Sequence, residues 1–181
     1  MRKLFFVSII IFLAACNGGN KKSGSDDKQS TSNGHKNEKT SLNAEGKVTY
    51  FDACADIKIN NVTMDFWPSS GNVLSDPKEK GKQFVRVELS VTSVCDKVFP
   101  YNYTSYKLKG SDGNQDGVTM YINDGNAKDI VKDTKDLKKG ESVTTALYFE
   151  VAANDKVQDL TFVAEGYDAT AKSSNAEIRL K

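Results

Sequence analysis

The feature that most constrains this chain is the recurrence of apolar residues at every second position. In the clearest segment, Val85, Val87 and Leu89 share one face of an extended chain, and polar residues between them share the other. The same period runs, with differing clarity, through residues 106–108, 118–122, 143–151, 160–164 and 176–181. Successive side chains of a β-strand point to opposite faces, so these segments predict strands that bury one face and expose the other.

Short runs of Gly, Pro, Asn, Asp and Lys separate the alternating segments, at residues 68–71, 110–113, 124–126 and 138–140. Such residues favour turns. About seven to nine short strands in residues 47–181 must bury their apolar faces against a second sheet. The sequence therefore predicts an all-β fold, an antiparallel β-sandwich. Within residues 55–66 the apolar phase slips by one position, which predicts a bulge or bend.

Residues 1–15 have the organisation of a secretory signal peptide. A short basic start, Arg2-Lys3, precedes an apolar stretch at residues 4–12, and small residues lead to Cys16. A stretch this short cannot span a hydrocarbon core of ~30 Å as a helix. Leu13-Ala14-Ala15-Cys16 resembles the bacterial lipobox, which implies cleavage before Cys16 and acylation of that residue with fatty acids such as palmitate. Because two or more acyl chains hold a protein stably on a bilayer, we expect a membrane-anchored lipoprotein.

The composition changes abruptly after the lipobox. Residues 17–46 are rich in Ser, Gly, Asn and Lys and contain no aromatic residue, so residues 16–46 are expected to form a lipidated, disordered tether. A coil of that length has a root-mean-square reach of about 30 Å. His35 is the single histidine of the chain and is expected to be a solvated residue of this tether. Residues 47–181 are left to form one folded domain.

Three segments of that domain carry a resemblance to a known family. Their sequences are GKQFVRVELSVT at residues 81–92, LKGSDG at residues 108–113 and LKKGESVTTALYFEV at residues 137–151. In spacing and residue character, residues 47–181 resemble the immunoglobulin-like domains of secreted and lipid-anchored bacterial proteins related to a mycobacterial immunoprotective antigen, which have a telokin-like sandwich. The resemblance implies an immunoglobulin-like sandwich, and since that family shares no catalytic set, no functional residue transfers. The chain departs from the pattern in lacking an Asn near residues 91–93 and in having two cysteines in the domain.

Cys54 and Cys95 are candidates for a disulfide, because a secreted chain lies where thiols oxidise. If the strands around them form a hairpin in which Phe66 faces Lys82, Cys54 lies opposite Val94, next to Cys95. The side-chain phase requires a bulge before the two sulfur atoms can meet. Two separate thiols are the alternative.

A turn at residues 112–117, Asp-Gly-Asn-Gln-Asp-Gly, matches the first half of a calcium-binding loop. Asp112, Asn114 and Asp116 supply oxygens at the first, third and fifth positions, but Asn123 stands where a bidentate Glu is expected. The same residues are what a tight turn between strands requires. A plain turn is the favoured interpretation, and a weak calcium site is the alternative.

Aromatic residues gather near predicted strand ends. Trp67, Phe99, Tyr101 and Tyr103 are candidate anchors for a protein or glycan partner, because rigid amphipathic rings on loops suit recognition. Aromatic side chains also cap the open ends of sandwich cores, and this second interpretation is favoured.

The sequence does not favour an enzyme. A general base near neutrality is most often a histidine, and residues 47–181 contain none. There is no zinc spacing, dinucleotide fingerprint or phosphate loop, so no metal or other cofactor is expected. The formal net charge of +1 gives no reason to expect nucleic acid binding.

A non-catalytic module that binds a protein or envelope partner is the leading hypothesis. A carrier of a small ligand or an ion such as calcium is the alternative. We expect an extracytoplasmic location, on the outer face of the cytoplasmic membrane in a Gram-positive cell, with the outer membrane possible in a Gram-negative one.

Overall fold

The computed structural model describes residues 34–68, 76–118 and 134–181. Ten strands and three short 3-10 helices lie in these ranges, and no helix there has the length and apolar character needed to cross a bilayer. The strands are β1 Glu38–Tyr50, β2 Ala53–Met64, β3 Lys82–Ser93, β4 Phe99–Tyr101, β5 Tyr106–Gly110, β6 Gly113–Asp116, β7 Lys135–Leu137, β8 Ser142–Ala152, β9 Thr161–Ala164 and β10 Ala176–Arg179. The 3-10 helices are η1 Pro77–Lys80, η2 Tyr103–Ser105 and η4 Val157–Asp159.

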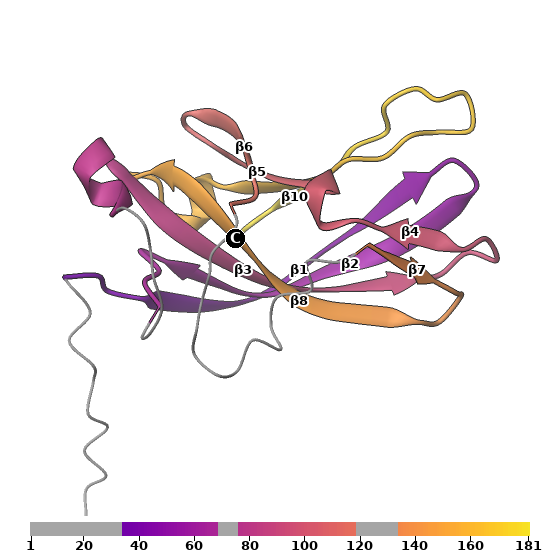
Figure 1. Ribbon diagram of the computed structural model, residues 1–181, viewed down its shortest axis with the longest axis horizontal. Helices are drawn as coiled ribbons and strands as arrows, with labels where there is room; N and C mark the ends of the chain where they lie inside the picture. Colours follow the sequence, from indigo (N-terminus) through magenta and orange to yellow (C-terminus); the bar gives the residue numbers. More distant parts are fainter. Residues whose placement is uncertain (1–33, 69–75, 119–133) are drawn as a thin grey trace, which may run out of the picture.

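The strands form two antiparallel layers (Figure 1). One sheet has the order β1-β2-β3-β8, and the other has the order β10-β9-β5-β6. A short ladder joins β4 to β7. The predicted all-β antiparallel sandwich is confirmed. The described strands exceed the expected number because ladders as short as β4 with β7 leave no alternation for the sequence to show.

The core lies between the layers, where the two inner apolar faces meet. Val85, Val87 and Leu89 of β3 are fully buried, as their alternation predicts. Phe149 of β8 packs edge-on against Phe162 of β9, with ring centroids 6.2 Å apart, and so joins the two sheets. The other predicted strand segments that lie in the described ranges also place apolar residues inside, whereas Met120 and Ile122 lie outside those ranges.

The outer face of the first sheet is only partly wet. Toward one end it carries hydroxyl pairs, including Thr92 with Ser142 at 2.8 Å. Toward the other end Tyr148 is buried, although its position in the alternation predicts exposure. Phe66, Trp67 and Val118 fold over this part of the sheet, and the Val118 N–H donates to the carbonyl of Tyr148 at 2.7 Å.

The structure corrects the expected tether. Strand β1 begins at Glu38 and pairs with β2 down to Gly46 and beyond, so residues 38–46 belong to the sandwich. His35 is buried, not solvated. This segment is polar because β1 is an edge strand, and most of its side chains before Val48 face solvent. Residues 1–33, which include the signal peptide and Cys16, lie outside the described residues.

The expected bulge and disulfide are both present. The register of β2 with β3 shifts between Ile59 and Asn61, within the segment where the apolar phase slips. Before the shift, Ala55 pairs with Ser93, which is the register that places Cys54 opposite Val94. Cys54 and Cys95 form a disulfide with their Cα atoms 5.3 Å apart, within the usual range.

This disulfide closes a loop across 41 residues of sequence separation. A cross-link of this size restricts the unfolded chain, so we expect the double variant Cys54→Ala/Cys95→Ala to lose about 4 kcal/mol of unfolding free energy. Urea unfolding followed by circular dichroism measures the change. An unchanged unfolding midpoint would contradict the stabilising role of this bond.

Candidate functional site

An aromatic cluster forms the turn between β1 and β2. Tyr50 ends β1, Phe51 lies in the turn, and Tyr167 approaches from the loop after β9. The Phe51 N–H donates to the Tyr167 carbonyl at 2.7 Å, and the Tyr167 N–H donates to the Thr49 carbonyl at 2.9 Å. These hydrogen bonds fix the backbone that carries the three aromatic rings.

The rings of this cluster reach solvent. Phe51 is 43 % exposed and Tyr167 is 39 % exposed. Their rings stack at a centroid distance of 6.2 Å, and Tyr50 lies edge-on to the Phe51 ring at 5.0 Å. Val98, 47 % exposed, is the other exposed large hydrophobic residue in the described ranges. It follows Cys95 by three positions, and the disulfide to Cys54 brings its loop to the same end. We call Phe51, Tyr167, Tyr50 and Val98 the aromatic end.

The backbone at Phe51 is unusual. Its φ of 54° lies in the left-handed region, which bulky residues rarely adopt and which costs about 1 to 3 kcal/mol. Glycine or asparagine would satisfy such a turn without this cost. Strain of this kind gathers at functional positions, which makes Phe51 a candidate site residue.

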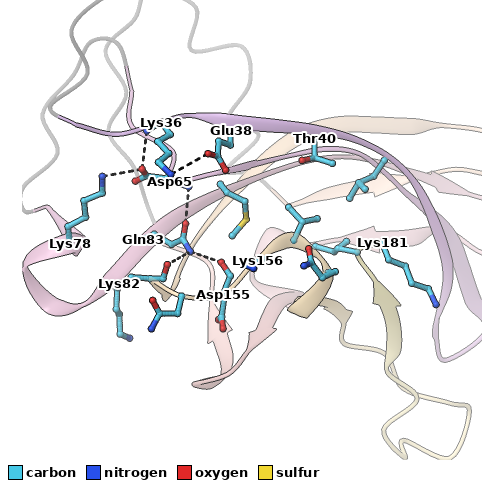
Figure 2. Close-up of a pocket in the computed structure, with 17 residues that line it drawn as sticks. Lys36, Glu38, Thr40, Asp65, Lys78, Lys82, Gln83, Asp155, Lys156 and Lys181 are labelled. Atoms are coloured by element: carbon cyan, nitrogen blue, oxygen red, sulfur yellow. Dashed lines mark hydrogen bonds and ion pairs between the residues drawn. The ribbon is translucent and has the colours of Figure 1, made fainter.

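A cavity lies at the opposite end of the sandwich (Figure 2). Its volume is about 730 Å³. The first residues of β1, the end of β2, the segment at residues 153–158 and the C-terminus line it. Leu42, Met64, Val157 and Leu180 supply its apolar surface.

The charges around the cavity are mostly compensated. Asp65 accepts the Lys36 N–H at 2.9 Å and lies 3.1 Å from Nζ of Lys78. Burial acts to raise the pKa of Asp65, but the Lys36 amide, Lys78 and His35 outweigh it and hold that pKa below its ordinary value. Lys82 and Lys181 point to opposite sides in Figure 2 and do not converge on one ligand. The rim therefore does not concentrate charge of one sign.

A buried amide holds this end together. Oε1 of Gln83 accepts the Asp65 N–H at 3.1 Å. Its Nε2 donates to the carbonyls of Ala152, Ala153 and Asp155 at 3.1, 3.1 and 2.9 Å. Gln83 thereby ties the end of β2 to the segment that follows β8.

His35 and Trp67 form a second stacked pair beside the cavity. Their ring centroids lie 4.5 Å apart with an angle of 11° between the planes. Nδ1 of His35 lies 2.6 Å from Asp65, and Nε2 lies 3.1 Å from Asp76. No pattern in the sequence indicates this cluster, because its residues come from three separate segments: residue 35, residues 65–67 and residue 76.

The four aromatic residues predicted from the sequence as candidate anchors differ in how far they are buried. Phe99 and Tyr101 are buried in the core, which agrees with core capping and leaves them unavailable as surface anchors. Burial raises the pKa of Tyr101 to about 12. Tyr103 is partly buried and packs on the core, and Trp67 is partly covered by His35. The rings that do reach solvent are those of Phe51 and Tyr167, which are not among the anchors predicted from the sequence. The adjacent aromatic residues Tyr50 and Phe51, between two strands, are the sequence feature that could have indicated this site.

The candidate calcium residues lie on a tight hairpin. Gly110 pairs with Gly113 at its turn, and Asn114 and Asp116 lie in β6. The side chains of these two residues are exposed, and the Asp116 carboxylate lies 3.4 Å from Nζ of Lys107. The turn is confirmed. No group of three or more His, Cys, Asp or Glu side chains within the described ranges is arranged to hold a metal ion.

Comparisons with known proteins show similarity in structure only. No family model matches the sequence, and no curated protein matches it. The fold is similar to that of ycdA from Bacillus subtilis, a protein assigned to the lipoproteins, with a TM-score of 0.51 and 17 % identity. That match covers 74 % of this chain and 38 % of ycdA, so this chain corresponds to well under half of its length.

Two further solved structures are similar at lower scores. A functionally unknown protein from Listeria monocytogenes has a TM-score of 0.47 and 16 % identity, covering 81 % of this chain and 90 % of that one. The secreted protein MPT63 from Mycobacterium tuberculosis has a TM-score of 0.40 and 12 % identity, covering 62 % and 76 %.

Asp65 gives the cavity end a predictable pH dependence. Because its pKa is lowered in the folded chain, its contribution to stability is present above the ordinary aspartate pKa of 3.8 and is lost as the pH falls below it. We expect Asp65→Asn to lower the urea midpoint at neutral pH and to lower it less at an acidic pH below 3.8. Asp112→Asn, on the exposed hairpin turn, is the matched control. Equal losses for Asp65→Asn at both pH values would contradict this assignment.

Proposed function

We propose that this chain is an extracytoplasmic lipoprotein whose sandwich is a non-catalytic binding module, with the aromatic end as its contact surface for a protein partner of the cell envelope. The lipobox-like sequence at Cys16 supports the anchor. The fold shared with ycdA, a protein assigned to the lipoproteins, supports the extracytoplasmic location.

The direction of β1 supports the orientation of the module. The chain enters the sandwich at residues 34–37, beside Asp65 and η1, and β1 then runs to the aromatic end (Figure 1). A strand of 13 residues spans about 40 Å. A domain attached to a bilayer through its N-terminal side can therefore present Phe51 and Tyr167 away from the lipid.

The exposed pair Phe51 and Tyr167 is the observation that carries the binding surface. Exposed aromatic rings on a rigid frame lose little conformational entropy on binding, and they are enriched among residues that dominate interface energy. The disulfide of Cys54 keeps this end rigid, and the strained turn keeps the Phe51 ring outside. A partner with a complementary apolar surface fits this arrangement.

The surroundings of the single histidine support a non-catalytic role. Both ring nitrogens of His35 lie within 3.1 Å of carboxylate oxygens, and its side chain has no exposed surface. A base in general acid–base catalysis must reach a proton on the substrate. His35 is thus engaged with Asp65 and Asp76 and turned away from solvent.

A small-ligand carrier is the second candidate function. The cavity of about 730 Å³ with its apolar lining favours it, since small-molecule sites are concave and mostly apolar. Lys82 and Lys181 at its rim point to opposite sides, so they cannot both bind one charged group of a small ligand.

Photo-crosslinking in cells tests the binding surface. A photoreactive residue at Asp52, next to the exposed rings, is expected to give a discrete crosslinked product, and the same residue at Glu45, exposed midway along β1, is not. Adding Phe51→Ala/Tyr167→Ala to the Asp52 probe should reduce the product more than about tenfold, because paired anchors of this kind contribute over 1.4 kcal/mol. Equal products at both positions, or a product unaffected by the ring substitutions, would overturn the proposal.

The anchor is tested by replacing Cys16 with serine. The native chain is expected to sediment with membranes and to incorporate a fatty acid analogue, whereas Cys16→Ser is expected to do neither. A Cys16→Ser chain that still carries the label and sediments with membranes would show that another group anchors the protein.

A further inference from the structure

His35 holds the point at which the chain enters the sandwich. Its side chain is fully buried between Asp65, at the end of β2, and Asp76, just before η1. Trp67 stacks on one face of the ring, and the Trp67 N–H donates to Oδ1 of Asn37 at 2.7 Å. Residues 34–37 are therefore fastened to the sandwich by this cluster, together with hydrogen bonds from the Asn37 N–H to the Asp65 carbonyl at 3.3 Å and from Nζ of Lys78 to the Gly34 carbonyl at 2.9 Å.

The chemistry of imidazole makes this arrangement depend on protonation. A neutral imidazole has one N–H, so it donates to one carboxylate and leaves its other nitrogen's lone pair facing the second. An imidazolium has two N–H groups and donates to both. The observed geometry, with Nδ1 2.6 Å from Asp65 and Nε2 3.1 Å from Asp76, suits the charged ring. A cation stacked on the face of Trp67 is stabilised further.

Among the described residues, the charged groups around the ring also contact one another. Asp65 also meets Nζ of Lys78 at 3.1 Å and the Lys36 N–H at 2.9 Å. Asp76 also accepts the Lys78 N–H at 2.9 Å and so caps η1. The side chain of Lys36 turns outward to Glu38, at 3.6 Å. The lowered pKa of Asp65 keeps that carboxylate charged to a lower pH than that of an ordinary aspartate.

We propose that His35 is a pH-responsive latch that fastens residues 34–37 to the cavity end of the sandwich when its ring is protonated and releases them when the ring is neutral. Release frees four residues at the point of entry, which extends the connection to the domain by up to about 14 Å. It also removes Lys36 from the rim of the cavity. Protonation of the ring thus shortens the connection to the domain, and loss of the ring proton lengthens it.

This latch is independent of what the aromatic end binds. Its closed state requires a charged ring and charged carboxylates. Protonation of the carboxylates removes the acceptors, and loss of the ring proton removes one donor.

The chain carries its own probe, since His35 and Trp67 are the single histidine and the single tryptophan. A stacked imidazolium accepts an electron from an excited indole more readily than a neutral ring does. For the full lipidated chain in detergent, we expect Trp67 emission to rise in one transition between about pH 5 and pH 8. His35→Gln should remove this transition.

Limited trypsin digestion gives a second readout. The quantity measured is the ratio of the cleavage rate after Lys36 to the cleavage rate after the exposed Lys172 in the same sample. Taking this ratio cancels the pH dependence of the protease itself. The ratio should rise several-fold between about pH 5 and pH 8 in the native chain and should be high throughout in His35→Gln. Asp76→Asn replaces one charged acceptor of the ring by a neutral one and should raise the ratio at acidic pH.

The two measurements give a clear outcome. A pH-independent Trp67 emission, or a Lys36 ratio that is constant in the native chain, would overturn the latch. If His35→Gln does not fold, Asp76→Asn decides: a ratio at acidic pH equal to that of the native chain would also overturn it.

Discussion

The pairing of β1 with β2 along its whole length is the constraint on which the account depends. It fixes the entry of the chain at one end of the sandwich and the turn with Phe51 at the other. Neither position could be set by a flexible tether that ended at residue 46. The inner half of this ladder is anchored by Val48, Ile57 and Ile59, which are fully buried in the core, so the ladder cannot slip without exposing apolar side chains.

The two ends that this ladder separates are built from different interactions. The aromatic end is fixed by backbone hydrogen bonds, a disulfide and ring contacts, which respond little to pH. The entry end is fixed by hydrogen bonds of Gln83 and by ion pairs of Asp65, and the ion pairs weaken when the Asp65 carboxylate is protonated. Under the two proposals, a change in acidity alters how the domain is attached and leaves the exposed rings of the binding surface in place.

The sequence predicts the centre of the fold well and its edges poorly. Val85, Val87 and Leu89 follow a strict period because both neighbours of β3 are strands, and the same register argument places Cys54 near Cys95. Strand β1 escapes detection because an edge strand has a polar pattern that resembles a linker. The His35 cluster escapes because its members lie far apart in sequence and have no spacing rule. Tyr148 is buried against its pattern, since Val118 and Phe66 cover a face that alternation alone assigns to water.

The orientation of the domain on its membrane is the claim that connects the fold to the proposed function. Energy transfer from a fluorescent residue at position 36 or position 52 to acceptor lipids, in vesicles carrying the acylated chain, measures it directly. The account predicts strong transfer from position 36 and weak transfer from position 52, because a strand of 13 residues, about 40 Å long, separates the two ends. Equal transfer, or stronger transfer from position 52, would contradict it.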